Sequence, residues 1–409
     1  MRVPQEVLDL ICGEYACRGA ELDVEREPES EVQDIPAQFP SARRDLATKL
    51  SIVSRSFYTA TMRVVWEWVV LHRVEDFAAL AEGDIGREMR WRTRRLDIAI
   101  RFEDGRAHED GYDGRRLRRI LETMPQLRVL ILNNTMERPA QPWRTSPMSE
   151  DVVDAIIACK LLERLEMASS TDRLHFLDFA RLSQTLHGLQ SLYVAAGTRV
   201  DEDGSRSGLD LPFQAAVFPR LQRLTLGCRT AGTMPNLIST MGGKGVNTIT
   251  TLRRIDIRFW GLRWSDECLG FLSRQGPYLE TFEWAIPPRP HITFLRGMTA
   301  LKTLILVYRT FVSVYVGLGD PMPNLELVVI RPDCLSPYAE GNHIACLSLI
   351  PAILAMRNPK LTCIRLEGDL DTFKRVFPGV LDTSVERDLV RAGVTLCCGD
   401  MEPRWEGRE

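Results

Sequence analysis

The chain has 409 residues, of which 44% are hydrophobic and 26% are charged, and its formal net charge is −3 at pH 7. This composition is enough to bury a large core, and the near-balanced charge gives no field that would attract nucleic acid or a membrane surface. No stretch approaches the roughly 18 uncharged apolar residues of a membrane-spanning helix, and residues 1–20 lack the pattern of a signal peptide. We therefore expect a cytoplasmic or nuclear protein without nucleic-acid or membrane partners.

The first helix is expected to begin near Pro4, because proline suits the first helical position and Glu6 favours the positive end of the helix dipole. Val7, Leu10 and Ile11 follow at i, i+3 and i+4 spacing and so share one face of that helix. This apolar face requires a partner.

An acidic segment follows the first helix. Residues 21–34 contain seven acids and a single arginine, which predicts a solvated, disordered insertion over about residues 18–45. Helical patterning resumes with Leu46, Leu50 and Val53. Ser54 is the expected N-cap of the next helix, whose apolar side carries Phe57, Val64 and Trp68.

A six-residue motif then recurs nine times, with starts 22 to 36 residues apart. It consists of Leu, two spacers, an aliphatic or aromatic residue, one spacer and a second aliphatic or aromatic residue. Its spacing is that of leucine-rich repeats with loop insertions. The starts are Leu127, Leu162, Leu189, Leu221, Leu252, Leu279, Leu301, Leu325 and Leu361.

Five of these motifs have a proline two residues before the first Leu, at Pro125, Pro219, Pro277, Pro323 and Pro359. Proline cannot continue a helix and fixes φ for entry into a strand, so each unit is predicted to run helix, stop, strand. Residues 113–124 and 149–157 have the apolar spacing of such helices. Weaker strands are expected at 66–71 and at 96–98, and a closing strand at 394–396.

The predicted fold is therefore an α/β leucine-rich-repeat solenoid, with parallel strands inside and helices outside, preceded by a small helical unit. We place the helical unit at residues 1–72 and the irregular repeat domain, with a C-terminal cap, at residues 73–409. Stacked repeats share one continuous core, which overrides the prediction of several domains from length alone.

The N-terminal unit combines an opening Val3-Pro4-Gln5-Glu6-Val7, a segment from Leu50 to Phe57 and a closing Trp66. These segments resemble an F-box, with Val3 in place of the usual Leu and a long insertion between them. The resemblance implies a non-catalytic substrate receptor of an SCF-type (cullin-RING) ubiquitin ligase. Its partners would be a Skp adaptor with the cullin ligase core, and an unknown protein substrate. The residues implied in adaptor binding are Pro4, Val7, Ile11, Leu50, Val53 and Phe57.

Two alternatives stand beside this interpretation. The helices could instead form the cap that the open end of a repeat array needs. The repeats could also serve as a protein-interaction scaffold without any role in a ligase.

The sequence offers little that points to catalysis. It contains no P-loop, nucleophile elbow or zinc signature, and the ten cysteines show no CxxC pair and are expected to be reduced. We expect no enzyme activity, cofactor or metal.

In each strand the residues between the core positions should face the inner surface of the solenoid. Candidate substrate-binding residues on that surface are Ile305, Val307, Leu327, Val329, Arg254 and Arg258. The four apolar ones would form a contiguous exposed patch, unless loop 331–342 or the C-terminal tail covers them. A second candidate is the run of eleven arginines in residues 87–119, which could bind an acidic or phosphorylated peptide or could be balanced by neighbouring acids.

Overall fold

The computed structural model describes residues 4–15, 45–84, 86–102, 114–136, 146–147, 150–167, 172–173, 176–194, 218–227, 248–258, 266–285, 293–308, 321–332, 350–367 and 383–399. The chain forms two compact units. The first comprises Met1–Leu211 with Ala216–Arg220, and the second Pro212–Ala215 with Leu221–Glu409. The predicted acidic insertion falls almost entirely outside the described residues.

The first unit begins with helices and continues as alternating strands and helices. Its helical elements are α1 (Gln5–Tyr15), the π-helical η3 (Leu46–Leu50), α4 (Arg55–Val65), α5 (Val74–Glu82), the 3-10 turn η4 (Arg90–Arg92), α6 (Gly114–Glu122), α7 (Glu150–Ala158) and α8 (Phe176–Thr185). Its main strands are β1 (Trp68–Leu71), β2 (Arg95–Ile98), β4 (Val129–Leu132), β7 (Arg164–Met167) and β9 (Ser191–Val194). Short parallel pairs form between β3 (Arg101–Phe102) and β5 (Thr135–Met136), and between β6 (Ser146–Pro147) and β8 (Asp172–Arg173).

The second unit contains seven described strands in the same alternation. These are β10 (Arg223–Gly227), β11 (Arg254–Arg258), β12 (Thr281–Ala285), β13 (Thr303–Tyr308), β14 (Leu327–Pro332), β15 (Cys363–Glu367) and β16 (Thr395–Gly399). Its helical elements are α10 (Asp266–Gln275), the 3-10 turns η5 (Gly276–Tyr278) and η6 (Thr293–Gly297), a helical stretch at 350–355, and α13 (Thr383–Ala392).

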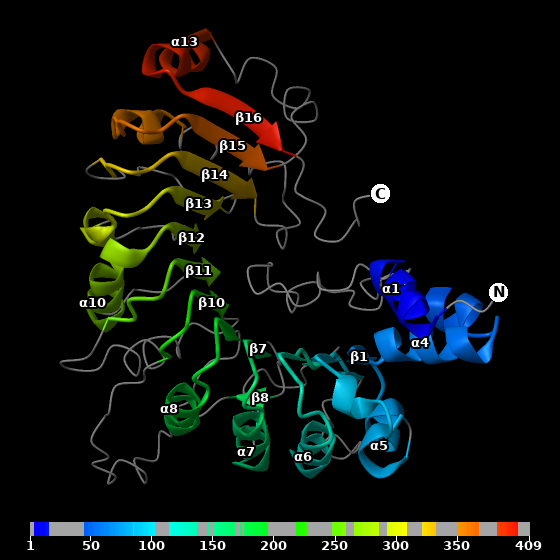
Figure 1. Cartoon of the computed structure of the whole chain (residues 1–409). Coiled ribbons are helices and arrows are strands. Elements are labelled where there is room, and N and C mark those ends of the chain that lie inside the picture. Colours follow the sequence, from blue (N-terminus) through cyan, green and yellow to red (C-terminus); the bar gives the residue numbers. More distant parts are fainter. Residues whose placement is uncertain are drawn as a thin grey trace, which may run out of the picture. The chain divides into compact units, whose positions relative to one another are not determined.

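Within each unit the main strands are parallel and follow one another in chain order, each paired with the strand of the next repeat. In the first unit, α5, α6, α7 and α8 pack in succession along one side of the strands (Figure 1). The predicted α/β leucine-rich-repeat fold is confirmed, because a parallel order without crossovers is what a stack of helix-strand repeats produces.

All nine predicted motif strands are present, and each begins two residues after the first Leu of its motif. The weaker strands predicted near 66–71, 96–98 and 394–396 correspond to β1, β2 and β16. The first Leu of every motif is at most 6% exposed, and the aliphatic side chains two positions apart in the strands are buried with it. The three apolar positions of each motif therefore face the core in every repeat.

The prolines before the motifs have a more specific role than stopping a helix. The amide of Leu127 donates to the carbonyl of Met124 at 3.1 Å, which closes a four-residue turn with Pro125 at its second position. Proline already has the φ that this position of a turn requires. The same bond closes the turns at Pro277, Pro323 and Pro359. Four motifs thus form this turn with proline, and the same backbone bond closes the turns before Leu162, Leu189, Leu252 and Leu301 without it.

One prediction about the N-terminal helices is corrected. Ser54 caps α4 as expected, because its hydroxyl accepts from the amide of Phe57 at 3.2 Å. However, the helix ends at Val65, and Trp68 begins β1 instead of lying on the apolar side of the helix. Its backbone joins the sheet by pairing with Arg95 of β2.

Candidate functional site

The N-terminal helices have a small apolar core of their own. Buried side chains of α1, η3 and α4 pack together, with Leu50, Phe57 and Val65 partly buried against them. Polar contacts fix the pair of helices: the side-chain amide of Gln5 donates to the Ser56 carbonyl at 3.1 Å, and Arg63 forms an ion pair with Asp9. The buried core residues are Leu8, Cys12, Leu46, Ala60 and Val64.

The outer face of the same helices is apolar and exposed. Val7, Leu10 and Ile11 of α1 are 42%, 64% and 49% exposed, so the face that the sequence marks as needing a partner has none within the described chain. The contact between Gln5 and Ser56 brings the start of α1 close to the start of α4. The turn preceding α4 carries two more exposed apolar side chains, Ile52 and Val53.

We call Val7, Leu10, Ile11, Ile52 and Val53 the N-terminal apolar face. Most soluble surfaces scatter their exposed aliphatic residues singly, so several on one helix and the adjoining turn indicate a binding surface.

The six residues implied in adaptor binding therefore divide into two groups. Pro4, Val7, Ile11 and Val53 are exposed, whereas Leu50 and Phe57 pack against the core of the helices. Sequence reasoning left out Ile52, which is 81% exposed, and Tyr58, which is 54% exposed on α4. A turn residue next to Val53 carries no helical periodicity, which is why the pattern did not single it out.

The sheet face opposite the helices is lined by paired charges. In the first unit, the Arg95 guanidinium donates to both oxygens of Asp97 at 2.8 Å and lies 4.1 Å from the centroid of the Trp68 ring, while Trp68 Nε1 donates to Asp97 at 2.9 Å. Arg164 makes an equivalent pair with Glu166 two residues along β7. All five side chains are buried. Burying a charge is tolerated only when it is paired, and β2 and β7 each supply both members of the pair.

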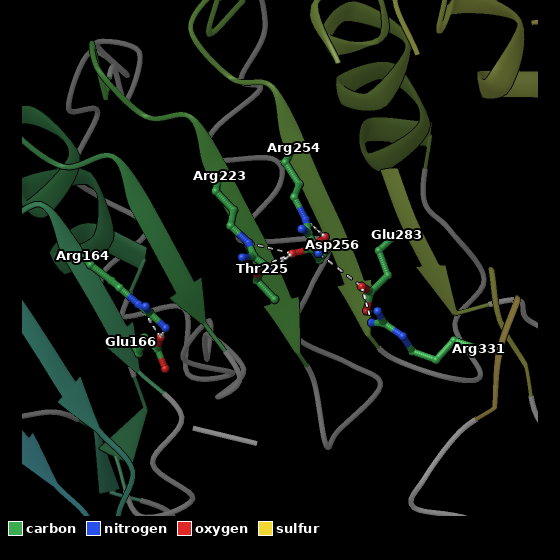
Figure 2. Close-up of polar contacts among 8 residues, drawn as sticks. All are labelled: Arg164, Glu166, Arg223, Thr225, Arg254, Asp256, Glu283 and Arg331. Atoms are coloured by element: carbon green, nitrogen blue, oxygen red, sulfur yellow. Dashed lines mark hydrogen bonds and ion pairs between the residues drawn. The ribbon is translucent and has the colours of Figure 1, made fainter. Parts of the chain in front are cut away.

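The second unit joins such pairs into a network across several strands (Figure 2). Asp256 on β11 accepts from Arg223 on β10 at 2.7 Å, from Thr225 at 2.9 Å and from Arg254 at 2.7 Å. Further along, Arg331 of β14 donates to Glu283 of β12 at 2.9 Å and pairs with Glu367 of β15. In this network, which we call the second-unit charge network, arginines and carboxylates alternate in space.

The second-unit charge network corrects the prediction of an exposed inner surface. Arg223, Thr225, Asp256 and Glu283 are at most 4% exposed. Arg254 is its most accessible described member, with 22% of its side chain exposed. Carboxylates and guanidiniums that already satisfy one another have little capacity left for an incoming charged ligand.

The predicted apolar patch is also buried. Ile305, Val307 and Val329 are between 4% and 9% exposed and pack with Ala285, while Leu327 is half-buried against them. The expectation that these side chains are exposed is therefore wrong. Their proposed role in substrate binding, like that of Arg254, remains a prediction. The side chain of Arg258 lies outside the described residues.

Several of the run of arginines at residues 87–119 have acidic neighbours. Arg87 pairs with Asp84, Arg116 with Glu82, and Arg118 with Glu122 and more distantly Asp151. Arg95 is buried against Asp97 in the sheet. These contacts favour the balanced-surface interpretation over a binding site for an acidic peptide.

Four cysteines have described side-chain surroundings: Cys12 and Cys159 are free and buried, and Cys363 and Cys397 form a disulfide. Burial raises the pKa of the Cys159 thiol to about 12, and burial together with Asp9 raises the pKa of Cys12, so neither thiol is activated as a nucleophile. Cys363 and Cys397, on the neighbouring strands β15 and β16, are joined by a disulfide. The expectation that all cysteines are reduced is thus contradicted for this pair. The pairing of β15 with β16 brings Cys363 and Cys397 together, although they lie 34 residues apart in the sequence.

The described part of the chain contains no group of three or more His, Cys, Asp or Glu side chains arranged to hold a metal ion. None of the described helices is both long and apolar enough to cross a membrane.

The fold is that of a leucine-rich-repeat α/β protein, and its leading helices carry an exposed apolar face. No protein-family model matches the chain, and no curated protein matches it. Among solved structures, one from the crystal structure of the yeast Rad7 and Elc1 complex aligns with 96% of this chain and 92% of its own, at 14% identity and a TM-score of 0.36. A superposition this poor carries no weight for fold or function.

Proposed function

We propose that this protein is a non-catalytic substrate-recognition subunit of an SCF-type ubiquitin ligase. In this role the N-terminal helices dock on a Skp adaptor, and the repeat-bearing remainder binds a protein substrate. The resemblance of the opening segment to an F-box supports the proposal. The observation that carries it is the N-terminal apolar face, which stays exposed although the same helices bury a separate core.

The two faces of α1 make the argument specific. Leu8 and Cys12 point into the core of the helices, whereas Val7 and Ile11 remain accessible one position before each of them. A helix whose only task was to cap the sheet would gain nothing from an exposed aliphatic face and would risk aggregation. An apolar groove on a partner protein is the kind of surface that such a helix fits.

The test is co-purification of the full-length chain with a purified Skp adaptor. We expect Val7→Asp and Ile11→Asp each to reduce adaptor binding by at least about tenfold, since placing a charge in a desolvated apolar contact costs well over 1.4 kcal/mol. Because both positions are exposed, the variants should retain the far-UV circular dichroism spectrum and the melting temperature of the unmodified protein.

A matched control is available in the second unit. Val390 on α13 is 80% exposed, so Val390→Asp introduces the same charge at an exposed position that is not part of the N-terminal helices. It should bind adaptor as the unmodified chain does. If the intact chain does not bind the adaptor, or if all three variants bind equally well, the ligase role is wrong and the scaffold interpretation takes its place.

Substrate binding is proposed for the repeat-bearing part of the chain without assigning it to the predicted apolar patch. Ile305, Val307 and Val329 are buried, so a protein could reach them only after they were uncovered. Crosslinking of the purified receptor to candidate substrates, followed by mass spectrometry, would locate the contact. Crosslinks next to β13 and β14 would restore the original assignment.

A further inference from the structure

The last two strands of the second unit carry a covalent link that holds the end of the sheet. Cys363 begins β15 and is paired in register with Thr395 of β16, and Cys397 lies two residues further along β16 on the same face. Their Cα atoms are 6.8 Å apart, and the disulfide closes a separation of 34 residues that includes α13.

The non-covalent packing around β16 is thin. Strand β10 is buried at every position, whereas Thr395 of β16 is exposed, and Leu396 and Cys397 are only partly buried. On α13, Leu389 is buried while Val390 and its described neighbours on either side of the pair are exposed. Few apolar contacts and an edge position are the features of a segment that opens locally.

The disulfide is also placed where chemistry in solution can reach it. Cys363 and Cys397 are both partly exposed, in contrast to Cys12 and Cys159, which are buried. Arg365 is exposed and lies directly opposite Cys397 in the register of β15 and β16. A guanidinium beside a cysteine favours its thiolate form, which is the form that attacks a disulfide.

We propose that Cys363 and Cys397 form a reversible thiol-disulfide switch that controls the attachment of β16 and α13 to β15. The oxidant is a low-molecular-weight disulfide of the glutathione type. The Cys397 thiolate attacks one of its sulfur atoms, the sulfur-sulfur bond of the oxidant breaks, and its other half leaves as a thiolate that takes up a proton. The Cys363 thiolate then attacks the mixed disulfide at Cys397 and releases the second thiol. A solution thiol reverses both steps.

The switch changes how firmly β16 is attached to the sheet of the second unit. In the oxidised state β16 is tied to β15 and forms the last strand. In the reduced state the covalent link is absent, and the segment 383–399 keeps its ladder with β15 and the buried side chains of Leu389 and Val394. This inference concerns the second unit and does not rest on the adaptor contact proposed for the N-terminal helices.

The experiment titrates the full-length protein in buffers with increasing ratios of oxidised to reduced glutathione. Thiols are trapped by alkylation at low pH, and peptides are analysed by mass spectrometry, with amide hydrogen exchange measured on the same samples. We expect a linked Cys363–Cys397 peptide pair whose fraction rises with the ratio. Amides in 395–399 should exchange roughly five-hundredfold more slowly in the oxidised protein, the order that closing a loop of this length supplies.

Three variants separate the switch from a general redox effect. Cys397→Ser should show the fast exchange of the reduced protein in every buffer, whereas Cys159→Ala should behave as the unmodified chain. Arg365→Gln should slow oxidation about threefold, the effect of removing one charge about 6 Å away in water. If Cys397→Ser fails to fold, the titration of the unmodified protein still tests the proposal.

The proposal is overturned if Cys363 and Cys397 are alkylated at every ratio of the titration. It is also overturned if the disulfide forms with Cys398 in place of Cys397, or if the linked and open forms exchange their 395–399 amides at the same rate.

Discussion

The pair formed by Arg164 and Glu166 gives the sharpest test of how the sheet is stabilised. Both side chains are 1% exposed, and Arg164 Nε donates to Glu166 Oε1 at 2.7 Å. Replacing Glu166 by Gln keeps the shape of the side chain but removes the negative charge. The Arg164 guanidinium is then left in the interior without its counter-ion.

The expected cost follows from the burial of both groups. Removing one partner of a buried ion pair costs about 3–5 kcal/mol, because the remaining charge has lost its hydration without compensation. Replacing both partners by apolar residues of similar volume is neutral or stabilising in comparable cases. We therefore expect Glu166→Gln to be strongly destabilising, and the double variant Arg164→Met, Glu166→Leu to recover most of the loss.

The assay is urea unfolding followed by far-UV circular dichroism. With a slope of about 3 kcal/mol per M, a loss of this size lowers the midpoint by about 1 M or more. The control is Glu122→Gln, which breaks the solvent-exposed pair between Glu122 and Arg118 and should leave the midpoint unchanged. Equal midpoints for Glu166→Gln and Glu122→Gln would refute the reasoning, as would a double variant no more stable than the single one.

Four further outcomes are expected. Gly86→Ala should lower the melting temperature several times more than Gly393→Ala, because both glycines have positive φ but only at Gly86 would the new Cβ meet another group, 1.9 Å from the Trp66 ring; equal losses would contradict this packing. Cys159 should react with iodoacetamide at pH 8 at least about a hundredfold more slowly in the folded chain than in urea. Because burial raises its pKa from 9.0 to about 12, its contribution to stability should also fall as pH rises above about 9; rapid labelling of the folded chain would argue against this burial. Ser54→Ala should destabilise α4 by about 1 kcal/mol, measured as faster amide exchange in that helix; unchanged exchange would show that the cap is not needed.

The N-terminal apolar face shows what helical periodicity in a sequence can predict and what it cannot. Spacing alone placed Val7, Leu10 and Ile11 on one side of a helix and marked that side as needing a partner. It gave no indication that Leu8 and Cys12, which also lie four residues apart, would supply the inner contact. Both sides of α1 satisfy the helical period, so only packing against α4 decides which one is buried.

The strands were predictable because their causes are local. The first Leu of each motif, the alternation that follows it and the turn before it all lie within a few residues of one another, and repetition along the chain fixes the parallel order. These features depend on backbone preferences and on burial of one face, both of which a short segment specifies by itself.

The opposite face of the sheet is decided by tertiary structure. Arg223 finds Asp256 across 33 positions of sequence, Arg331 reaches Glu283 across 48, and the disulfide joins residues 34 apart. Alternation places these side chains on one surface, but whether they are exposed or paired depends on the register between repeats. Hydrophobic burial is specified residue by residue, and the pairs Arg95–Asp97 and Arg164–Glu166 each lie within one strand. The pairs between strands of the second unit require two distant residues to meet, and only the folded stack of repeats brings those together.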